Sequence, residues 1–268
     1  MDAIDLTAYR ARIGWKSDHV PGLAALTRLL QAHMAAIPFE NFDVLLGRGV
    51  RLDLPSLQRK LVDDRRGGYC FEHATLLAAA LEQLGYALVR HTARVVLVTP
   101  RNAAPRTHMF IVVTLGDRRY VLDPGFGALA PRVPVPLDES IAAGEHGDTH
   151  WMQREGGHWT LRTKVDGADT DCWVTALEED NAADFAMGNY YTSTHPGSAF
   201  VERIMLRALT PQGRVSLMNR DLTIRENGRS TRSQVRDRAQ LRELVRDFCG
   251  FDLPALETLR VPSIPEWT

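Results

Sequence analysis

Apolar residues follow helical spacing in the first third of the chain. In residues 23–36 they recur every three or four positions, at Leu23, Leu26, Leu30 and Met34. This spacing predicts a helix with one apolar stripe, and Pro38 ends it. A shorter helix is predicted over 54–64, with Pro55 tolerated near its start. A third helix is predicted over 70–84, because apolar residues recur at the same spacing and Gly85 follows as a stop.

After residue 86 the pattern changes to strands. The segment "ALVRHTARVVLVTP" is rich in β-branched residues and is bounded by Pro100. "HMFIVVTL" and "YVLDPGFG" are predicted to be two strands joined by a turn at Gly116 and Asp117. Residues 130–175 combine scattered prolines and glycines with short strands, which is typical of a small barrel or sandwich.

The last part of the chain is mixed. "NYYTSTHPGSAF" (residues 189–200) has no regular period, so we expect a structured loop there. Three alternating segments then predict strands, and a final helix is predicted from about Ser233 to Cys249, with Gly250 as its stop. The order of element types is therefore helices, then an all-β middle, then a mixed tail. The expected fold class is α+β.

Composition and charge exclude few functions but limit the expected partners and the expected cellular location. The chain has 268 residues and a formal net charge of −1, so its overall charge gives no reason to expect nucleic acid or an anionic membrane as a partner. No apolar run approaches the roughly 20 residues that span a bilayer, and the first residues do not resemble a signal peptide. The three cysteines lie far apart and do not form a disulfide framework. We therefore expect a cytoplasmic protein.

Cys70 stands at an unusual place for a core cysteine. It follows Gly67, Gly68 and Tyr69 and lies in the first turn of the predicted 70–84 helix. Unpaired backbone N–H groups and the positive end of the helix dipole point outward there. Such a position stabilises a thiolate over a thiol. The sequence therefore suggests a nucleophile at Cys70.

A cysteine nucleophile needs a base, and the base needs a group that orients it. His108 begins a strand that is apolar on both faces, and Asp123 lies near the end of the next strand. If Gly116 and Asp117 form a two-residue loop, His108 and Asp123 share a face of the sheet as diagonal neighbours. A loop of three residues would separate them. The hairpin thus predicts the second half of a Cys-His-Asp triad.

Each of these residues also has an ordinary structural explanation. Cys70 taken alone is more often an inert, half-buried thiol, and His108 alone is more often a core histidine. Asp123 alone is a common turn former before proline. A metal site has less support, since no CxxC, HxH or HExxH spacing occurs. The conjunction of the three residues favours a triad, but the residues alone leave both interpretations open.

At this point the chain resembles a known family, the arylamine N-acetyltransferases of prokaryotic type. The matching stretches are "IPFENFDVLL" (37–46), "RGGYCFEHATLLAAALEQLGY" (66–86), "THMFIVV" (107–113), "YVLDPGFG" (120–127) and "NYYTSTHPGSAF" (189–200). They occur in the family's order, with 38 residues from Cys70 to His108 and 15 from His108 to Asp123. The resemblance is good to about residue 200, and the last 68 residues match only in general character.

The resemblance implies a three-part α+β fold with a cysteine-protease-like Cys-His-Asp core. Residues 1–86 would form a helical bundle that carries the cysteine. Residues 87–190 would form a β-barrel that carries the histidine and the aspartate, and residues 191–268 would form an α/β lid. Arg12 and Glu40 align with a charged pair that ties the first helix to the "PFEN" segment, which we interpret as structural.

The resemblance also implies a ping-pong acetyl transfer. Cys70 would take the acetyl group of acetyl-CoA as a thioester, and a small arylamine, arylhydrazine or arylhydroxylamine would then take it from Cys70. His108 would keep the cysteine as a thiolate and relay protons, and Asp123 would orient the imidazole. No metal is expected. The expected partners are coenzyme A and the small acceptor, with neither nucleic acid nor membrane.

Further site residues come from the same resemblance. The acceptor pocket would include Phe39, Tyr69, Val95 and Phe200, and Phe126 would lie beside them. Gly125, Phe126 and Gly127 would form the loop where backbone N–H groups approach the pyrophosphate of coenzyme A. Ordinary core packing is the alternative for Phe39 and Phe200, and a plain turn is the alternative for the two glycines.

Two other functions remain open at this stage. A cysteine hydrolase or transglutaminase-like enzyme shares the chain order Cys, His, Asp, although no "CGSCW"-type segment occurs. An inactive binding module on the same scaffold is the second alternative. The sequence leaves open the physiological acceptor, the preferred acyl chain length and the oligomeric state.

Overall fold

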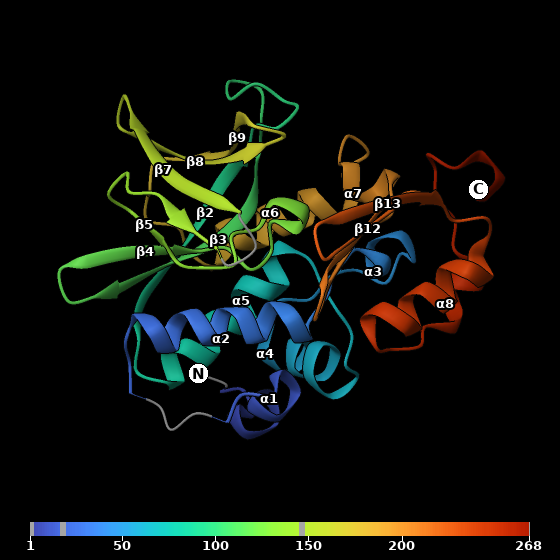
Figure 1. Cartoon of the computed structure of the whole chain (residues 1–268), viewed down its shortest axis with the longest axis horizontal. Helices are drawn as coiled ribbons and strands as arrows, with labels where there is room; N and C mark the ends of the chain where they lie inside the picture. The colour runs from blue at the N-terminus through green and yellow to red at the C-terminus, as the bar shows by residue number, and fades with distance from the viewer. Residues whose placement is uncertain (1–2, 17–19, 145–147, 268) are drawn as a thin grey trace.

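A computed structural model describes residues 3–16, 20–144 and 148–267. Figure 1 shows three groups of elements: helices in the lower half, a large sheet at the upper left, and a second sheet with helix α8 on the right. None of the helices in the described ranges is long and apolar enough to cross a bilayer.

The helices predicted in the first third of the chain are confirmed. They are α2 Leu23–Ala36, α4 Leu54–Leu57 and α5 Cys70–Gln83. Two further helices, α1 Leu6–Ile13 and α3 Phe42–Leu45, lie in the same part of the chain. A π-helical segment, η1 Gln58–Asp63, continues α4. Asp5 caps the start of α1 and Asp53 the start of α4, each by accepting a backbone N–H three residues ahead.

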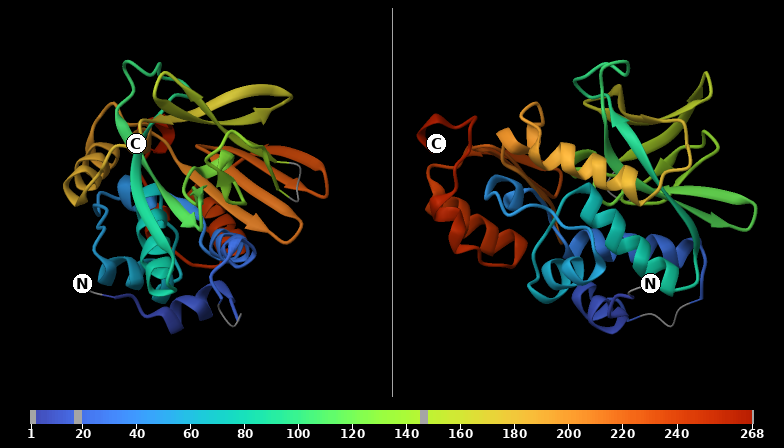
Figure 2. Two further views of the ribbon diagram at one scale, coloured as in Figure 1. Left: turned by 90° about the vertical axis from the view of Figure 1, so that its left-hand side faces the viewer. Right: turned by 180° about the vertical axis from the view of Figure 1, so that it is seen from behind.

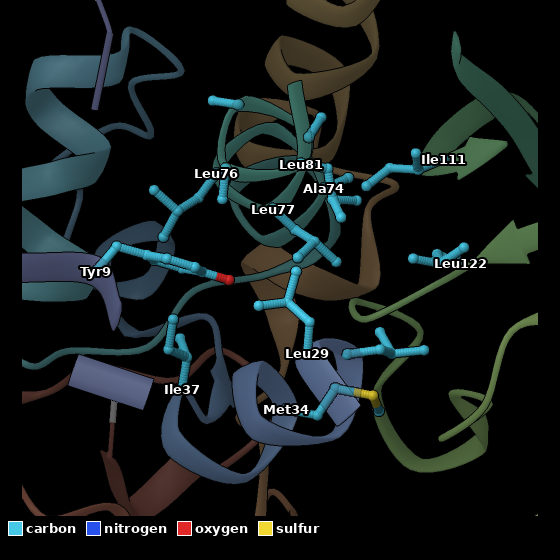
Figure 3. Packing of buried hydrophobic residues seen from close by; sticks show 14 of the residues in the cluster. Tyr9, Leu29, Met34, Ile37, Ala74, Leu76, Leu77, Leu81, Ile111 and Leu122 are labelled. Atoms are coloured by element: carbon cyan, nitrogen blue, oxygen red, sulfur yellow. The ribbon is translucent and has the colours of Figure 1, made fainter. Parts of the chain in front are cut away.

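Helix α5 lies in the centre of the molecule. All of its residues from 70 to 81 are buried, so it is covered on every side rather than along one apolar stripe. Figure 3 shows Leu77 of α5 pointing toward Leu29 of α2 and Leu76 pointing toward Tyr9 of α1, while Ile111 of the sheet lies on the side of α5 away from Tyr9. Because α5 packs against both helices and sheet, its first residue is held in a fixed place between the two layers.

The middle of the chain forms an antiparallel, nearly closed barrel. Its order is β5 (Val135–Pro136), β4 (Arg118–Leu122), β3 (Arg106–Leu115), β2 (Ala87–Val95), β9 (Ala168–Thr175), β8 (His158–Val165), β7 (Thr149–Glu155) and β6 (Ala142–Ala143). Strand β5 at one end of this order contacts β7 near the other end. The short 3-10 helix η2 (Gly127–Leu129) follows β4 in the chain.

The hairpin between β3 and β4 has the two-residue loop that the sequence predicts. Leu115 pairs with Arg118, and the register continues to Ile111 opposite Leu122. Gly116 has a φ of 59°, which a residue with a side chain adopts only under strain. The loop length fixes the pairing register of the two strands, and in this register residues 108 and 123 share a face of the sheet.

A second antiparallel sheet closes the other side of the molecule. Its order is β1 (Phe39–Glu40), β10 (Met205–Thr210), β11 (Gly213–Met218), β12 (Asp221–Glu226) and β13 (Arg229–Gln234). Helix α8 (Arg238–Cys249) packs on this sheet, and two 3-10 turns, η3 Pro254–Thr258 and η4 Pro265–Trp267, end the described chain. Strand β1 comes from the N-terminal third, so this sheet joins the two ends of the chain.

Two predictions for the last third were wrong in part. Residues 189–200 are not a loop: α6 (Ala182–Thr194) and α7 (Ala199–Glu202) include most of them. The buried positions of α6 follow helical spacing, but three of them are Gly188, Asn189 and Thr192, so the apolar pattern hides the helix. The final helix ends at Cys249 as predicted but begins at Arg238, because β13 takes the residues before it.

Helix α6 bridges the parts of the molecule. It packs on β2 and β3, and α7 follows it toward the second sheet (Figure 2, right). The expected division between barrel and lid at residue 190 falls inside this helix. The division of the chain into three parts remains a prediction.

A buried ion network holds the segment that leads into α5. The ammonium of Lys60 lies 2.8 Å from Asp43 and 2.8 Å from Glu72, and both carboxylates are largely buried. Glu40 is fully buried and pairs with Arg66 at 2.7 Å. The expected pair of Arg12 with Glu40 is therefore wrong.

Arg12 instead donates hydrogen bonds to backbone carbonyls. Its guanidinium reaches the carbonyl oxygens of Leu61 and Arg65, each at 3.0 Å. Because these carbonyls lie in the segment just before α5, Arg12 still ties the first helix to the region of Cys70, through backbone rather than through a carboxylate.

Replacing Lys60 by methionine is expected to destabilise the fold strongly. The substitution keeps the length of the side chain but leaves the Asp43 and Glu72 carboxylates without their shared cation, and breaking a buried pair costs about 3–5 kcal/mol. The free energy of unfolding in urea measures the loss. Arg51→Met is the control, since the exposed Arg51–Asp53 pair at 2.8 Å should contribute less than about 1 kcal/mol. Equal losses in the two variants would contradict a structural role for the network.

Candidate active site

Cys70 is the first residue of α5, as the sequence predicts. The carboxylate of Glu72 accepts the backbone N–H of Tyr69 at 3.0 Å and so caps the first turn. The Cys70 side chain is 2% exposed, and its Sγ lies 3.7 Å from the carbonyl oxygen of Thr107. The nucleophile candidate thus sits at the positive end of a buried helix, facing the start of strand β3.

A bulge in strand β3 brings that carbonyl to the cysteine. In the ladder between β2 and β3, Ala93 pairs with His108 and Arg94 pairs with Arg106, so Thr107 is an extra residue. The Thr107 carbonyl oxygen is near Cys70 and also accepts the hydroxyl of Thr192 on α6, at 3.4 Å. Bulges are frequent beside active sites because they redirect side chains.

His108 and Asp123 form the pair that the hairpin predicts. Nε2 of His108 lies 2.8 Å from Oδ2 of Asp123, and both side chains are buried. Interactions with Cys70 help to raise the pKa of His108, so the sulfur lies close to the imidazole. The ring of Phe126 packs edge-on against the imidazole, with 5.0 Å between ring centroids.

The charges around His108 favour its protonated form. Burial alone would lower the pKa of the imidazole, since it disfavours the charged state. The charge of Asp123, its hydrogen bond and the interactions with Cys70 outweigh burial and raise the pKa of His108 to about 10. At neutral pH the ring is an imidazolium beside the sulfur.

Trp173 is a neighbour of the pair that the sequence did not reveal. Its indole Nε1–H donates to Oδ2 of Asp123 at 2.8 Å, so this oxygen accepts from both Trp173 and His108. Oδ1 of Asp123 is buried and has no hydrogen-bond partner among the described residues.

Gly125 and Gly127 are required by the geometry of the chain. A Cβ on Gly125 would lie 2.4 Å from the Cα of Cys70, closer than real Cβ contacts ever come. Gly127 has a φ of 60°, and its carbonyl accepts a hydrogen bond from the buried guanidinium of Arg207 on β10. Gly125 therefore permits contact between the aspartate segment and the nucleophile, and Gly127 permits the turn after it.

Three of the expected pocket residues lie together. The ring of Phe200 is 5.3 Å from Tyr69 and 6.2 Å from Phe39 between centroids. The hydroxyl of Tyr69 donates to the side chain of Asn189 on α6. Val95 lies at the end of β2, opposite Trp173 of β9 in the ladder. The structure thus gathers an aromatic group directly beside Cys70, because Tyr69 precedes the cysteine.

The remaining titratable groups are arranged for structure rather than for metal binding. In the described part of the chain, no group of three or more His, Cys, Asp or Glu side chains is placed to hold a metal ion. All three cysteines are free thiols. Burial raises the pKa of Cys172 to about 12 and also raises the pKa of Cys249, so both stay protonated at neutral pH.

Comparison with known proteins gives a consistent result. A family model described as N-acetyltransferase matches residues 22–257. The arylamine N-acetyltransferase of Mycolicibacterium smegmatis is 34% identical over 256 residues, covering 94% of this chain and 93% of that protein. The arylamine N-acetyltransferase / N-hydroxyarylamine O-acetyltransferase of Salmonella typhimurium is 34% identical over 248 residues, covering 91% and 88%.

A solved structure is similar over the whole fold. The arylamine N-acetyltransferase of Mycobacterium marinum in complex with CoA superposes with a TM-score of 0.88 at 32% sequence identity, and the match covers 94% of each chain. The likeness therefore extends to the last third of the chain, where the sequence motifs end.

The protonation of His108 predicts how Cys70 reacts with an alkylating agent. Since the raised pKa keeps the imidazolium charged until pH rises through about 10, alkylation by iodoacetamide should be fast and nearly constant between pH 6 and 9. In His108→Ala the rate should be lower at pH 6 and climb steeply with pH, as for an ordinary thiol. The rate of Cys70 modification by mass spectrometry measures both. A wild-type rate that climbs like that of the variant would contradict an effect of the His108 charge on the reactivity of Cys70.

Proposed function

The chain belongs to the arylamine N-acetyltransferase family, and we propose that Cys70, His108 and Asp123 are its catalytic triad. It is an acetyltransferase that uses acetyl-CoA. The observation that carries the assignment of the triad is geometric. The buried imidazole of His108 is hydrogen-bonded to Asp123 through Nε2 and lies close to Cys70 at the start of α5.

The first half-reaction loads the cysteine. The Cys70 thiolate attacks the carbonyl carbon of acetyl-CoA, and the bond between that carbon and the sulfur of coenzyme A breaks. The His108 imidazolium supplies the proton that the departing thiolate of coenzyme A takes up. Cys70 is then a thioester and His108 is neutral. The thioester preserves the reactivity of the acetyl group, so two easier steps replace one direct transfer.

The second half-reaction delivers the acetyl group. The nitrogen of an arylamine, arylhydrazine or arylhydroxylamine attacks the thioester carbonyl, and the Cys70 sulfur leaves as a thiolate. Neutral His108 accepts the proton lost by the nitrogen, which restores the starting ion pair. An aromatic amine suits this step because it is weakly basic and so unprotonated at neutral pH.

The aromatic residues beside Cys70 suit the acceptor. We assign Phe39, Tyr69 and Phe200, with Val95 at the barrel edge, to the acceptor pocket. Support comes from the ring contacts of Phe200 with Tyr69 and with Phe39. Offset or edge-on packing against such rings would orient the ring of an aromatic amine. Tyr69 precedes the nucleophile, so an acceptor held there lies close to the thioester.

The segment Gly125–Gly127 suits the donor. We assign Gly125, Phe126 and Gly127 to the place where backbone N–H groups approach the pyrophosphate of coenzyme A. The Mycobacterium marinum relative, which is structurally alike throughout, has been solved in complex with CoA. Because the segment follows Asp123 and contacts Cys70 through Gly125, donor and triad would share one short stretch of chain.

A reducing location agrees with this chemistry. Three free cysteines, one of them the nucleophile, persist where disulfides are not formed. We therefore propose that the enzyme acts in the cytoplasm on small molecules, with neither nucleic acid nor a membrane as its partner.

Incubation with acetyl-CoA alone is expected to release one coenzyme A per chain in a burst. Mass spectrometry should find the acetyl group on Cys70, because only this cysteine lies at the triad. Cys70→Ala should abolish both signals, whereas Cys172→Ser should leave them within about twofold, since its thiol is kept protonated by burial. Continuous release of coenzyme A without an amine would indicate a hydrolase. Acetyl on another cysteine would refute the assignment of Cys70.

Gly127→Ala is expected to raise the KM for acetyl-CoA more than the KM for the small acetyl donor p-nitrophenyl acetate. With acetyl-CoA the KM should rise about tenfold, the loss of about one hydrogen bond to a charged group. With p-nitrophenyl acetate, which has no pyrophosphate, the KM should change less than about twofold. Initial rates with both donors measure the contrast.

Gly116→Ala is the matched control for Gly127→Ala. Gly116 has nearly the same φ, 59°, at the distant β3–β4 turn, so the variant carries similar backbone strain away from the site. Equal losses with both donors in Gly127→Ala would mean that Gly127 serves the turn and not coenzyme A.

A further inference from the structure

The Asp123 carboxylate accepts its two described hydrogen bonds on one oxygen. His108 Nε2 and Trp173 Nε1 both lie 2.8 Å from Oδ2, while Oδ1 is buried without a partner among the described residues. We propose that Trp173 is a positioning residue for acetyl transfer, whose indole N–H holds Oδ2 of Asp123 toward His108. This inference rests on the triad proposed above.

The carboxylate needs such a restraint because its own torsion is soft. Rotation about the last side-chain bond of aspartate has broad minima, so one donor alone leaves the plane of the carboxylate free to turn. Two donors that converge on Oδ2 fix both the oxygen that faces His108 and the angle at which it is presented. The indole N–H is a donor only and carries no net charge, so it restrains the carboxylate without neutralising it.

A bulge in β9 places the indole at the carboxylate. In the ladder between β8 and β9, Leu161 pairs with Trp173 and Arg162 pairs with Asp171, so Cys172 is an extra residue. Cys172 and Trp173 are both fully buried, although neighbouring strand residues normally face opposite sides. The bulge therefore redirects Trp173 into the barrel.

This bulge matches the one in β3. Thr107 is the extra residue immediately before His108, and Cys172 is the extra residue immediately before Trp173. The two donors to Asp123 thus each follow an irregularity that breaks the regular ladder. If His108 and Trp173 only filled the barrel interior, neither strand would need an extra residue immediately before the side chain that binds Asp123.

The indole cannot swing away from Asp123. Its ring stacks on Phe110, with centroids 4.3 Å apart and planes 24° apart, and its centroid is 6.1 Å from that of His108. Phe110 lies on β3 two residues after His108, so the strand that carries the imidazole also holds the indole. The N–H therefore acts as a fixed donor rather than as one of several rotamers.

Trp173→Phe removes the donor and keeps an aromatic ring in the barrel. The rate of Cys70 acylation should fall about ten- to hundredfold, as expected for a lost hydrogen bond to a charged group. The KM for acetyl-CoA should change less than about twofold, because Asp123 lies outside the Gly125–Gly127 segment that we assign to the donor. Trp267→Phe is the control: Trp267 is buried in the lid, and its loss should leave acylation unchanged. An unchanged acylation rate in Trp173→Phe would overturn the proposal.

A double-mutant cycle separates positioning from packing. In an Asp123→Ala background the carboxylate is gone, so Trp173→Phe should slow acylation by less than about twofold more. The same fold loss in both backgrounds would show that Trp173 acts only by packing and would overturn the proposal. The burst with acetyl-CoA, measured separately, tests the triad itself, so the two failures are distinguishable.

The indole N–H can also be observed directly, even if Trp173→Phe does not fold. Among the five tryptophans, one indole N–H proton of the ¹⁵N-labelled enzyme should resonate downfield and exchange slowly. That signal should move upfield and exchange faster in Asp123→Ala. If all indole signals are the same in the two proteins, the hydrogen bond to Asp123 has no role in solution and the proposal fails.

Discussion

The contact between Gly125 and Cys70 is the constraint on which the site depends. A single added carbon on Gly125 would lie 2.4 Å from the Cα of the cysteine, so the turn after β4 must meet the first residue of α5 backbone to backbone. This contact is possible only because the surrounding packing holds both segments in place. Helix α5 is buried on all sides between helices and sheet, and the carboxylate that caps it is paired with a buried lysine. The nucleophile is therefore placed by packing that extends across the whole N-terminal half.

The electrostatics of the site depend on that placement. A buried histidine would ordinarily be neutral, and only the approach of Asp123 and of the cysteine makes the imidazolium favourable. Because the pKa of His108 is raised by folding, its charged form stabilises the fold fully below about pH 6.5, and this contribution is lost as pH rises through about 10. The ion pair that serves the reaction is thus also part of what the fold gains at neutral pH.

The sequence predicted the elements whose rules are local. The two-residue loop at Gly116 fixed the parity of His108 and Asp123, and helical spacing with a following glycine located α5 and therefore Cys70. Where the deciding contacts are distant, prediction failed. Residues 189–200 were expected to form a loop because α6, which includes the first of them, buries polar residues against β3. Arg12 was paired with Glu40 although it binds backbone carbonyls. No local signal distinguishes these cases.

Trp173 shows why the innermost part of the site escaped prediction. Strand alternation would place Cys172 and Trp173 on opposite faces, and only the bulge buries both. A bulge has no sequence signature of its own when neither residue is glycine. The same holds for Thr107, whose carbonyl meets the cysteine because it is out of register. Regular strands supply the rigid barrel, and departures from regularity direct His108 and Trp173 to Asp123 and the Thr107 carbonyl to Cys70. Sequence rules that assume regularity therefore fail where the chemistry needs exceptions to them.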